Sequence, residues 1–274
     1  MQKLIISSLL LSIFLYGCTA KSETPQKIRV VRTVEKTKVA EASDIPVSAA
    51  TIIQRKQVPI LCYHRLENKN TASDYTVSIN SFKEQLKLLA DSGYHSVLPG
   101  QLNDYLIKGT PLPSKPFMLT FDDTRQEHYS IAAPEMEKYG FRGVFFVMTI
   151  SIGRPNYMSS EQIKELSDKG HVIASHTWDH SNVKKLKEND WAVQIDKPNQ
   201  RIQAITGKPA LYFAYPFGLW NDSAVAQIKK HSFKAAFQLT GKRSETDPLY
   251  TIRRTLVPGT WTVPQVLKRM KTMF

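Results

Sequence analysis

The stretch Phe117-Met118-Leu119-Thr120-Phe121-Asp122-Asp123 decides the fold of this chain, because an apolar run ends directly in two adjacent carboxylates. A second stretch has the same form, with Val172-Ile173-Ala174 leading into Ser175-His176-Thr177-Trp178-Asp179-His180. Short apolar runs of this kind predict buried strands, and parallel α/β folds place their chemistry at the carboxyl ends of such strands. We therefore expect the two carboxylates and the two imidazoles to meet at one edge of a parallel sheet.

Apolar runs alternate with amphipathic stretches along most of the chain. The predicted strands are residues 60–63, 117–121, 144–148, 172–175, 212–215, 235–239 and 250–256. Predicted helices include residues 81–90 and 161–168, the second behind a Ser159-x-x-Gln162 capping box, and Gly93, Gly140 and Gly170 follow helical patterns as stop signals. This alternation predicts a mostly parallel α/β sheet, either doubly wound or closed into a distorted barrel.

The N-terminus is typical of an exported protein. Residues 1–17 carry Lys3 as their only charge and contain an apolar stretch too short to span a bilayer. Leu15-Tyr16-Gly17-Cys18 matches the bacterial lipobox pattern, so we expect 1–17 to be a lipoprotein signal and Cys18 to be lipidated; an ordinary cleaved signal or an uncleaved anchor is the alternative. Residues 18–56 predict a flexible tether, and 57–274 a catalytic domain in the bacterial cell envelope.

The charge balance is strongly basic, with 37 Lys and Arg against 24 Asp and Glu, a net charge of +13. Loss of residues 1–17 removes one positive charge, which leaves +12. We do not expect nucleic acid as a partner, because the chain is exported and lacks a dense basic run interleaved with aromatics. Three explanations of the basic charge remain: attraction to anionic lipid headgroups, attraction to acidic envelope polymers, or a generally solvated basic surface. If Cys18 is lipidated, Cys62 has no disulfide partner, and we expect a buried, inert thiol.

The conjunction of the two motifs indicates a mononuclear metal hydrolase. Two imidazoles and a carboxylate suit zinc or a similar divalent ion, so we expect Asp123, His176 and His180 to be ligands. The spacing of the two histidines can bring both rings to one side of a helical turn. Asp122 would then be the base that takes a proton from the attacking water. Taken alone, an Asp-Asp pair is usually part of a solvated turn, and an H-x-x-x-H pair usually occurs by chance without binding a metal.

These motifs resemble those of the polysaccharide deacetylases, the NodB-homology group of carbohydrate esterase family four, over residues 58–257. The resemblance implies a distorted (β/α) barrel of about seven parallel strands. It also implies that Asp122 is the base and that Asp123, His176 and His180 bind the metal. Thr124 stands where the family usually has Gly, which predicts an altered loop.

The third family motif departs further, since Ala214 in Phe213-Ala214-Tyr215-Pro216-Phe217-Gly218 replaces the Arg that orients the base. This form is similar to the branch that deacetylates poly-N-acetylglucosamine, in which a His from an N-terminal strand is the general acid. Here that residue would be His64, which can protonate an amine near neutral pH; a structural hydrogen-bonding role is the alternative. Candidate replacements for the lost Arg are Arg125, Arg253 and Arg254.

The remaining candidates concern the substrate. The backbone amide of Phe217 could polarise the acetyl oxygen. Trp178, Tyr215 and Trp220 could stack on sugar rings, with core packing expected for at least one of them. We expect the other histidines to be structural or surface residues; these are His95, His128, His171 and His231.

We therefore predict a lipid-anchored, divalent-metal hydrolase of linear amides, with zinc as the expected ion. It would remove N-acetyl groups from N-acetylglucosamine units of an envelope polysaccharide or exopolysaccharide. The alternatives are a peptidoglycan or O-acetyl polysaccharide deacetylase, a non-catalytic glycan-binding lipoprotein and a purely structural one. The expected partners are the N-acetylated polysaccharide and, through Cys18, a membrane; we expect a monomer.

Overall fold

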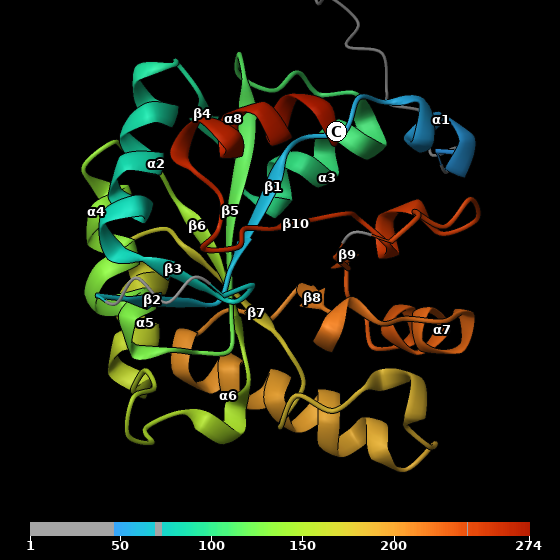
Figure 1. Cartoon of the computed structure of the whole chain (residues 1–274). Coiled ribbons are helices and arrows are strands. Elements are labelled where there is room, and N and C mark those ends of the chain that lie inside the picture. Colours follow the sequence, from blue (N-terminus) through green and yellow to red (C-terminus); the bar gives the residue numbers. More distant parts are fainter. Residues whose placement is uncertain (1–46, 69–72, 240) are drawn as a thin grey trace, which may run out of the picture. The chain divides into compact units, whose positions relative to one another are not determined.

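The computed structural model describes residues 47–68, 73–239 and 241–274. Seven parallel strands form one curled sheet in the order β10-β1-β5-β6-β7-β8-β9, and β4 pairs with the beginning of β5 (Figure 1). The strands of this sheet are β1 (Ile60–Tyr63), β4 (His95–Ser96), β5 (Pro116–Asp122), β6 (Gly143–Val147), β7 (Val172–Ser175), β8 (Tyr212–Ala214), β9 (Ala235–Phe237) and β10 (Thr255–Leu256). The predicted parallel α/β sheet is confirmed.

The two edges of this sheet meet at one segment near the C-terminus. The Ile252 backbone N–H donates to the carbonyl of Ala236, in β9, and its carbonyl accepts from the N–H of Gln238, directly after β9. Three residues later, Thr255 and Leu256 pair with β1. The sheet is therefore a distorted barrel, as the family resemblance implied. The predicted strand 250–256 is shorter than expected, because Pro248–Tyr250 forms a short 3-10 helix.

Helices surround the sheet (Figure 1). They are α1 (Ala49–Gln54), α2 (Ile79–Asp91), α3 (Pro99–Lys108), α4 (Ala133–Glu137), α5 (Ser160–Asp168), α6 (Lys197–Thr206), α7 (Asp222–Lys230) and α8 (Val263–Thr272). The two helices predicted explicitly are confirmed as α2 and α5. The capping box at α5 is present, since Ser159 Oγ accepts from Gln162 N at 3.3 Å and Gln162 Oε1 accepts from Ser159 N at 2.9 Å. A separate pair of short parallel strands, β2 (Arg65–Glu67) and β3 (Thr76–Ser78), follows β1.

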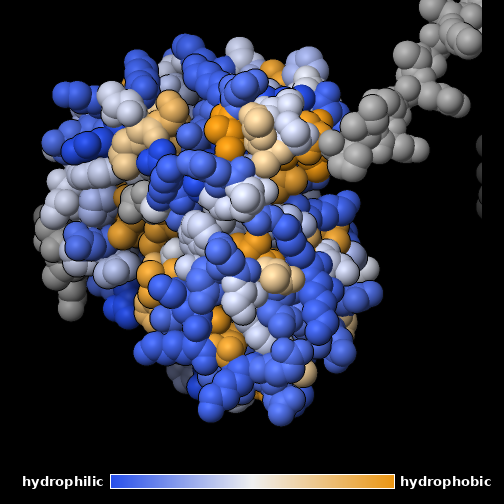
Figure 2. Space-filling view, turned by 90° about the vertical axis from the view of Figure 1, so that its right-hand side faces the viewer, coloured by the Kyte–Doolittle hydropathy of each residue, from blue (hydrophilic) through white to orange (hydrophobic). Residues whose placement is uncertain are grey.

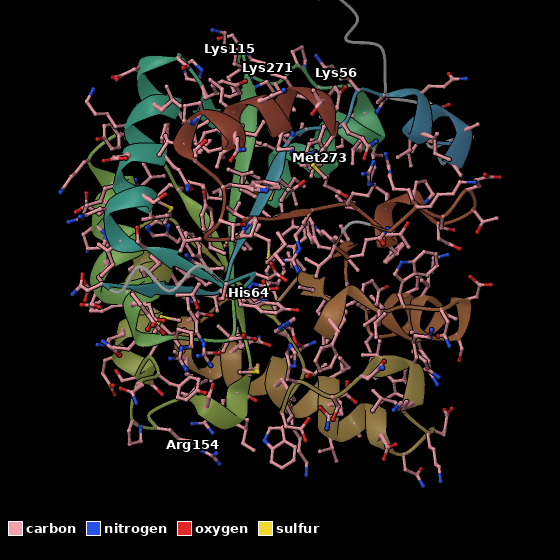
Figure 3. All side chains as sticks on the ribbon, in the orientation of Figure 1. Lys56, His64, Lys115, Arg154, Lys271 and Met273 are labelled. Carbon is pink, nitrogen blue, oxygen red and sulfur yellow. The ribbon has the colours of Figure 1, made fainter. Side chains whose placement is uncertain are left out.

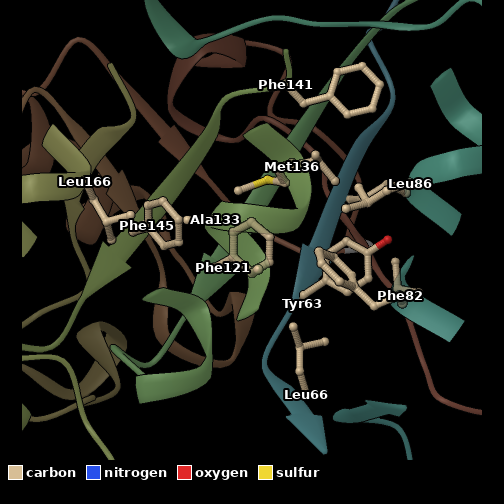
Figure 4. Close-up of a cluster of buried hydrophobic side chains, with 14 of the residues drawn as sticks. Tyr63, Leu66, Phe82, Leu86, Phe121, Ala133, Met136, Phe141, Phe145 and Leu166 are labelled. Carbon is tan, nitrogen blue, oxygen red and sulfur yellow. The ribbon is translucent and has the colours of Figure 1, made fainter. Parts of the chain in front are cut away.

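Strand alternation separates an outer core from an inner one. Outside the barrel, Tyr63, Phe121 and Phe145 of three adjacent strands stack in sequence, with ring centroids 5.6 and 5.1 Å apart, against α2, α4 and α5 (Figure 4). Inside, residues such as Met118 and Phe146 form a second cluster. The face in Figure 2 is mostly hydrophilic with scattered apolar residues. Because side chains alternate, every second residue of a strand faces the inside of the barrel. At the carboxyl end, the next residue in this inward-facing series lies at the barrel mouth.

The structure corrects the predicted boundary between tether and domain. Helix α1 lies within the stretch predicted as tether (18–56), and its Ile52 is buried in the inner core. The described fold therefore begins by Val47, which packs on the same cluster. The predicted signal (1–17), Cys18 and most of the predicted tether lie outside the described residues. Over the described ranges, no helix combines the length and apolarity needed to cross a membrane.

Candidate metal centre and catalytic site

The alternation of inward and outward side chains explains how three strands supply one site. Along β5, Phe117, Leu119 and Phe121 belong to the outer core, so Thr120 and Asp122 point inward. The same alternation turns the residue after β1, His64, and the residue after β7, His176, toward the barrel mouth. The polar residues that follow these strands therefore converge at their carboxyl ends.

The three expected metal ligands lie together. Asp123 Oδ1 is 3.7 Å from His176 Nε2 and 3.6 Å from His180 Nε2. One ligand atom from each of the three residues lies within 4.8 Å of the others. The expected helical turn between the histidines is wrong, because the segment is a non-helical turn in which Thr177 and His180 have φ of 66° and 70°. That turn nevertheless places the two imidazole centroids 4.9 Å apart.

The donor atoms of this trio fit a divalent ion. Asp123 Oδ1 and His176 Nε2 are buried and have no hydrogen-bond partner among the described residues. His176 Nδ1 lies 2.7 Å from the Ala214 carbonyl and must donate to it, so Nε2 carries a free lone pair. Buried acceptors that face one another without a donor are costly unless a cation lies between them. Two imidazole nitrogens and one carboxylate oxygen are the donors that zinc and similar ions take.

The protonation states agree with a ligand role. Burial lowers the pKa of His176 to about 3 and also lowers the pKa of His180. Both imidazoles are thus neutral near pH 7, as metal binding requires. Burial raises the pKa of Asp123, so its ionised form gains most from a nearby cation.

The expected base, Asp122, is held by Arg254. The guanidinium of Arg254 donates two hydrogen bonds to the carboxylate, at 2.7 and 2.8 Å, and both side chains are buried. Arg254 Nε also donates to the Gln238 carbonyl, and Nη1 to Thr120 Oγ1. Burial raises the pKa of Asp122, but the charge and hydrogen bonds of Arg254 outweigh it and hold this pKa well below its usual range. Asp122 is therefore ionised.

Of the three arginines considered as substitutes for the missing family Arg, the structure selects Arg254. Arg125 instead pairs with Glu127 at 3.3 Å. Arg253 has no such contact, and its buried Nε lacks a hydrogen-bond partner within the described ranges. Arg254 reaches Asp122 because the segment that closes the barrel lies next to β1, which itself pairs with β5. The sequence alone could not choose among the three.

His64 and Cys62 complete the surroundings of Asp122. His64 Nε2 is 3.9 Å from Asp122 Oδ2, and its ring packs edge-on against Tyr75. The Cys62 thiol is buried, as expected, and burial raises its pKa. Its Sγ also donates to Asp122 Oδ2 at 3.6 Å, a contact that the sequence did not indicate. His128, expected to be structural or at the surface, is buried and donates from Nε2 to the His64 carbonyl at 2.6 Å.

Thr124 shows how the loop tolerates the loss of the family Gly. It has φ of 61° and follows Asp123 at φ 77°, a conformation that is strained for any residue with a side chain. The Thr124 hydroxyl accepts from Met148 N at 2.8 Å and donates to Met148 O at 3.2 Å. These two bonds tie the ligand loop to the end of β6 and offset the backbone strain.

Only some of the expected substrate residues are accessible. Tyr215 is fully buried against Phe213, so the prediction that it stacks on a sugar is wrong. Trp178 and Phe217 are 38% and 58% exposed, and the Phe217 ring lies 4.4 Å from that of His180. Trp220 is partly buried and donates to Gln238 Oε1.

Two cavities meet beside Asp123. One, of about 380 Å³, is bordered by His180 and by Arg65, Arg125 and Arg154. The other, of about 320 Å³, is bordered by His64, Tyr75 and again Arg65. Space for a substrate therefore extends to both sides of the ligand trio, and the Tyr75 ring borders one of these spaces.

The sequence and the barrel of this chain are similar to those of known deacetylases. The family model for polysaccharide deacetylase matches residues 109–236. The poly-beta-1,6-N-acetyl-D-glucosamine N-deacetylase of Staphylococcus aureus (strain MRSA252) is 26% identical over 239 residues, which cover 77% of this chain and 82% of that protein.

Two solved structures share the fold. The Streptococcus pyogenes deacetylase PplD, in complex with acetate, superimposes with a TM-score of 0.72 at 22% identity, covering 78% of this chain and 98% of that one. IcaB from Ammonifex degensii gives a TM-score of 0.67 at 27% identity, covering 80% and 99%. The chain matches the polysaccharide deacetylase family over residues 109–236 and resembles named deacetylases over most of its length. It is accordingly a hydrolytic deacetylase, and the non-catalytic alternatives are set aside.

Proposed function

We propose that this chain is a metal-dependent N-deacetylase that acts on N-acetylglucosamine units of a poly-N-acetylglucosamine-like exopolysaccharide or envelope polymer. The observation that carries the proposal is the pair of buried ligand atoms on Asp123 and His176 that lack a hydrogen-bond partner among the described residues, next to an Asp122 carboxylate fixed by Arg254. The substrate class rests on the name of the Staphylococcus aureus relative. The choice of zinc rests on the two imidazoles and one carboxylate.

The roles of the chain's own residues follow from their positions. A divalent cation held by Asp123, His176 and His180 would supply Lewis acidity toward the acetyl carbonyl and the attacking water. Asp122 is ionised and accepts the proton of that water as it attacks. Arg254 keeps the carboxylate in one orientation, which removes the cost of reorganising it during the reaction.

The leaving amine needs a proton, and His64 is positioned to supply one. Its Nε2 lies 3.9 Å from Asp122 Oδ2, and this proximity supports the proposal that acid and base act on the same substrate group. Phe217, with φ of 59°, contacts the ring of the ligand His180, and its backbone N–H is the proposed donor to the oxyanion. The exposed rings of Trp178 and Phe217 are the proposed stacking surfaces for sugar rings.

Export and lipidation at Cys18 are part of the proposal. They are supported by the lipobox pattern of residues 15–18. Metabolic labelling with a fatty-acid analogue tests the anchor, because a Cys18→Ala chain should take up none. Labelling that persists in this variant would contradict the assignment.

The deciding experiment is acetate release from a soluble β-1,6-linked N-acetylglucosamine oligomer by the purified chain. We expect release to stop after chelation and to return on addition of zinc. Parallel reactions with peptidoglycan and with an O-acetylated polymer separate the substrate alternatives. Release that is insensitive to chelation would overturn the metal dependence, and faster release from either other polymer would overturn the substrate class.

A further inference from the structure

The end of the barrel opposite the candidate site carries a cavity of about 530 Å³. Val58 and Pro59, directly before β1, and Pro116, the first residue of β5, line it. The site lies at the carboxyl ends of the same strands, after Tyr63 and at Asp122. Figure 3 accordingly shows Lys56, Lys115 and Lys271 at one end of the barrel, with His64 and Arg154 toward the other.

Three lysines and no acidic residue border this cavity. Lys56, Lys115 and Lys271 are exposed, and none has a carboxylate within 4.0 Å in the part of the chain that the structure describes. Lys115 donates to the Ser92 carbonyl at 2.7 Å, which holds its ammonium at the rim without neutralising it. The side chains that border the cavity therefore carry three positive charges and no negative one, on a chain whose net charge is +13.

The wall between the lysines is mainly apolar. It includes Tyr94, Tyr105, Leu112, Pro113, Met270 and Phe274. Lysine ammonium groups around aromatic and aliphatic side chains form the pattern that binds at a bilayer interface, where the charges meet anionic headgroups and the apolar groups enter the boundary layer.

We propose that this lysine-rimmed cavity is a docking surface for the anionic phospholipid surface of a membrane. Charge complementarity selects an anionic partner. The position of the N-terminal segment favours a bilayer as that partner. Residues 1–46, which include the proposed lipidation site Cys18, join the fold at Val47, and Val47 packs on the same apolar cluster as the cavity residues Tyr105 and Leu112. With the cavity on the bilayer, the mouth that holds Asp122 faces away from it, toward polymer outside.

The test compares vesicle binding of two charge-reversal variants of the full chain, each carrying Cys18→Ala to remove the lipidation site. One has Lys56→Glu, Lys115→Glu and Lys271→Glu. The other has Lys184→Glu, Lys185→Glu and Lys187→Glu, exposed lysines in the loop after the ligand histidines. Both lower the net charge equally. The apolar stretch near the N-terminus is identical in all chains, so it cancels in the comparison.

Vesicles of phosphatidylcholine with phosphatidylglycerol should bind the parent chain more tightly than vesicles of phosphatidylcholine alone. We expect the cavity variant to lose about tenfold or more of the affinity for anionic vesicles, and the loop variant less than about twofold. In the parent chain, anionic vesicles should also slow amide hydrogen exchange in residues 111–116. An unchanged circular dichroism spectrum and thermal unfolding midpoint of the cavity variant show that it is folded.

Equal losses in the two variants would overturn the proposal, because net charge rather than this surface would then drive binding. Equal binding of the parent to neutral and anionic vesicles would overturn it as well. So would a soluble acidic polysaccharide that binds the cavity as tightly as the vesicles do. None of these outcomes depends on the proposed sugar substrate.

Discussion

Asp122 and Asp123 are neighbours in the sequence, yet the regions around them differ in how completely their polar atoms are paired. Around Asp122, Arg254, Thr120 and Cys62 form a network in which both carboxylate oxygens accept hydrogen bonds. Around Asp123, a carboxylate oxygen and the facing imidazole nitrogen of His176 have no partner among the described residues. The polar atoms of the base region are therefore paired within the protein, whereas those of the ligand region leave room for the proposed ion.

The largest expected effect is a loss of acetate release without a loss of metal, which would separate the function of the base region from that of the ligand region. Asp122→Asn should lower acetate release by about 10²–10⁴-fold, because it removes the proton acceptor, while the ligand trio keeps its metal. Acetate release and metal content are measured on the same sample. Asp168→Asn, which alters an exposed carboxylate paired with Lys164, should change neither. Loss of metal together with activity would show that the two regions are not separable.

Removing the partner of the base should cost stability. Arg254→Met leaves Asp122 as a buried carboxylate without its counter-charge, which we expect to lower the free energy of unfolding by about 3–5 kcal/mol. Denaturant unfolding measures this, with Arg253→Met as the matched control at the next position. If both variants lose the same small amount of unfolding free energy, the ion pair does not hold the barrel closed.

The ligand region should respond to metal instead. At an ion concentration of about 100–1,000 times the dissociation constant, binding stabilises the folded chain by about 3–4 kcal/mol. His176→Ala should lose the bound metal and, with it, this gain in stability. Thermal unfolding with and without zinc measures the gain. His231→Ala, which removes a contact to Asp196, should keep both. Full metal occupancy in His176→Ala would refute its role as a ligand.

Stability of the metal-free chain should fall as the pH falls. Burial lowers the pKa of His176 and of His128 to about 3 each, against about 6.5 in the unfolded chain. Between these pKa values the unfolded chain binds more protons than the folded chain. Each of the two histidines therefore lowers the free energy of unfolding by about 1 kcal/mol as the pH falls from 6.5 to 5.5. Asp122, whose pKa is depressed, stays ionised here in both states and contributes no slope. Urea unfolding in chelator at the two pH values measures the change; a flat profile would contradict it.

The smallest effect concerns the loop between the two regions. Thr124→Gly relieves a backbone conformation that costs about 1–3 kcal/mol but removes two hydrogen bonds of about 1 kcal/mol each to Met148. We expect a net change in unfolding free energy within about 1 kcal/mol, measured by denaturant titration. A clear gain in stability would mean that the hydroxyl contributes little to holding the ligand loop.

Much of this architecture could be predicted from the sequence because it is local. The bounds of β1 and β7 match the prediction to the residue, since each is a short apolar run followed at once by polar residues. For the same reason the motifs located Asp122, Asp123, His176 and His180 at strand ends.

What could not be predicted depends on contacts distant in sequence. Arg254 is 132 residues from Asp122, and only closure of the barrel brings it to that carboxylate. Tyr215 was misassigned although alternation along β8 held the answer: Ala214 belongs to the inner core, so its neighbours Phe213 and Tyr215 point the other way. The short strands β2, β3 and β4 carry too few residues to show a periodic pattern.

Closure of the barrel by residues 252–256 also sets an order in time. Because a chain is synthesised from its N-terminus, Asp122 emerges from the ribosome long before Arg254, which lies 132 residues later. Until that last segment docks beside β1, the base has no counter-charge and the sheet has two open edges. Pairing of Asp122 therefore waits for synthesis of residues 252–256, so a chain truncated before Arg254 should be inactive.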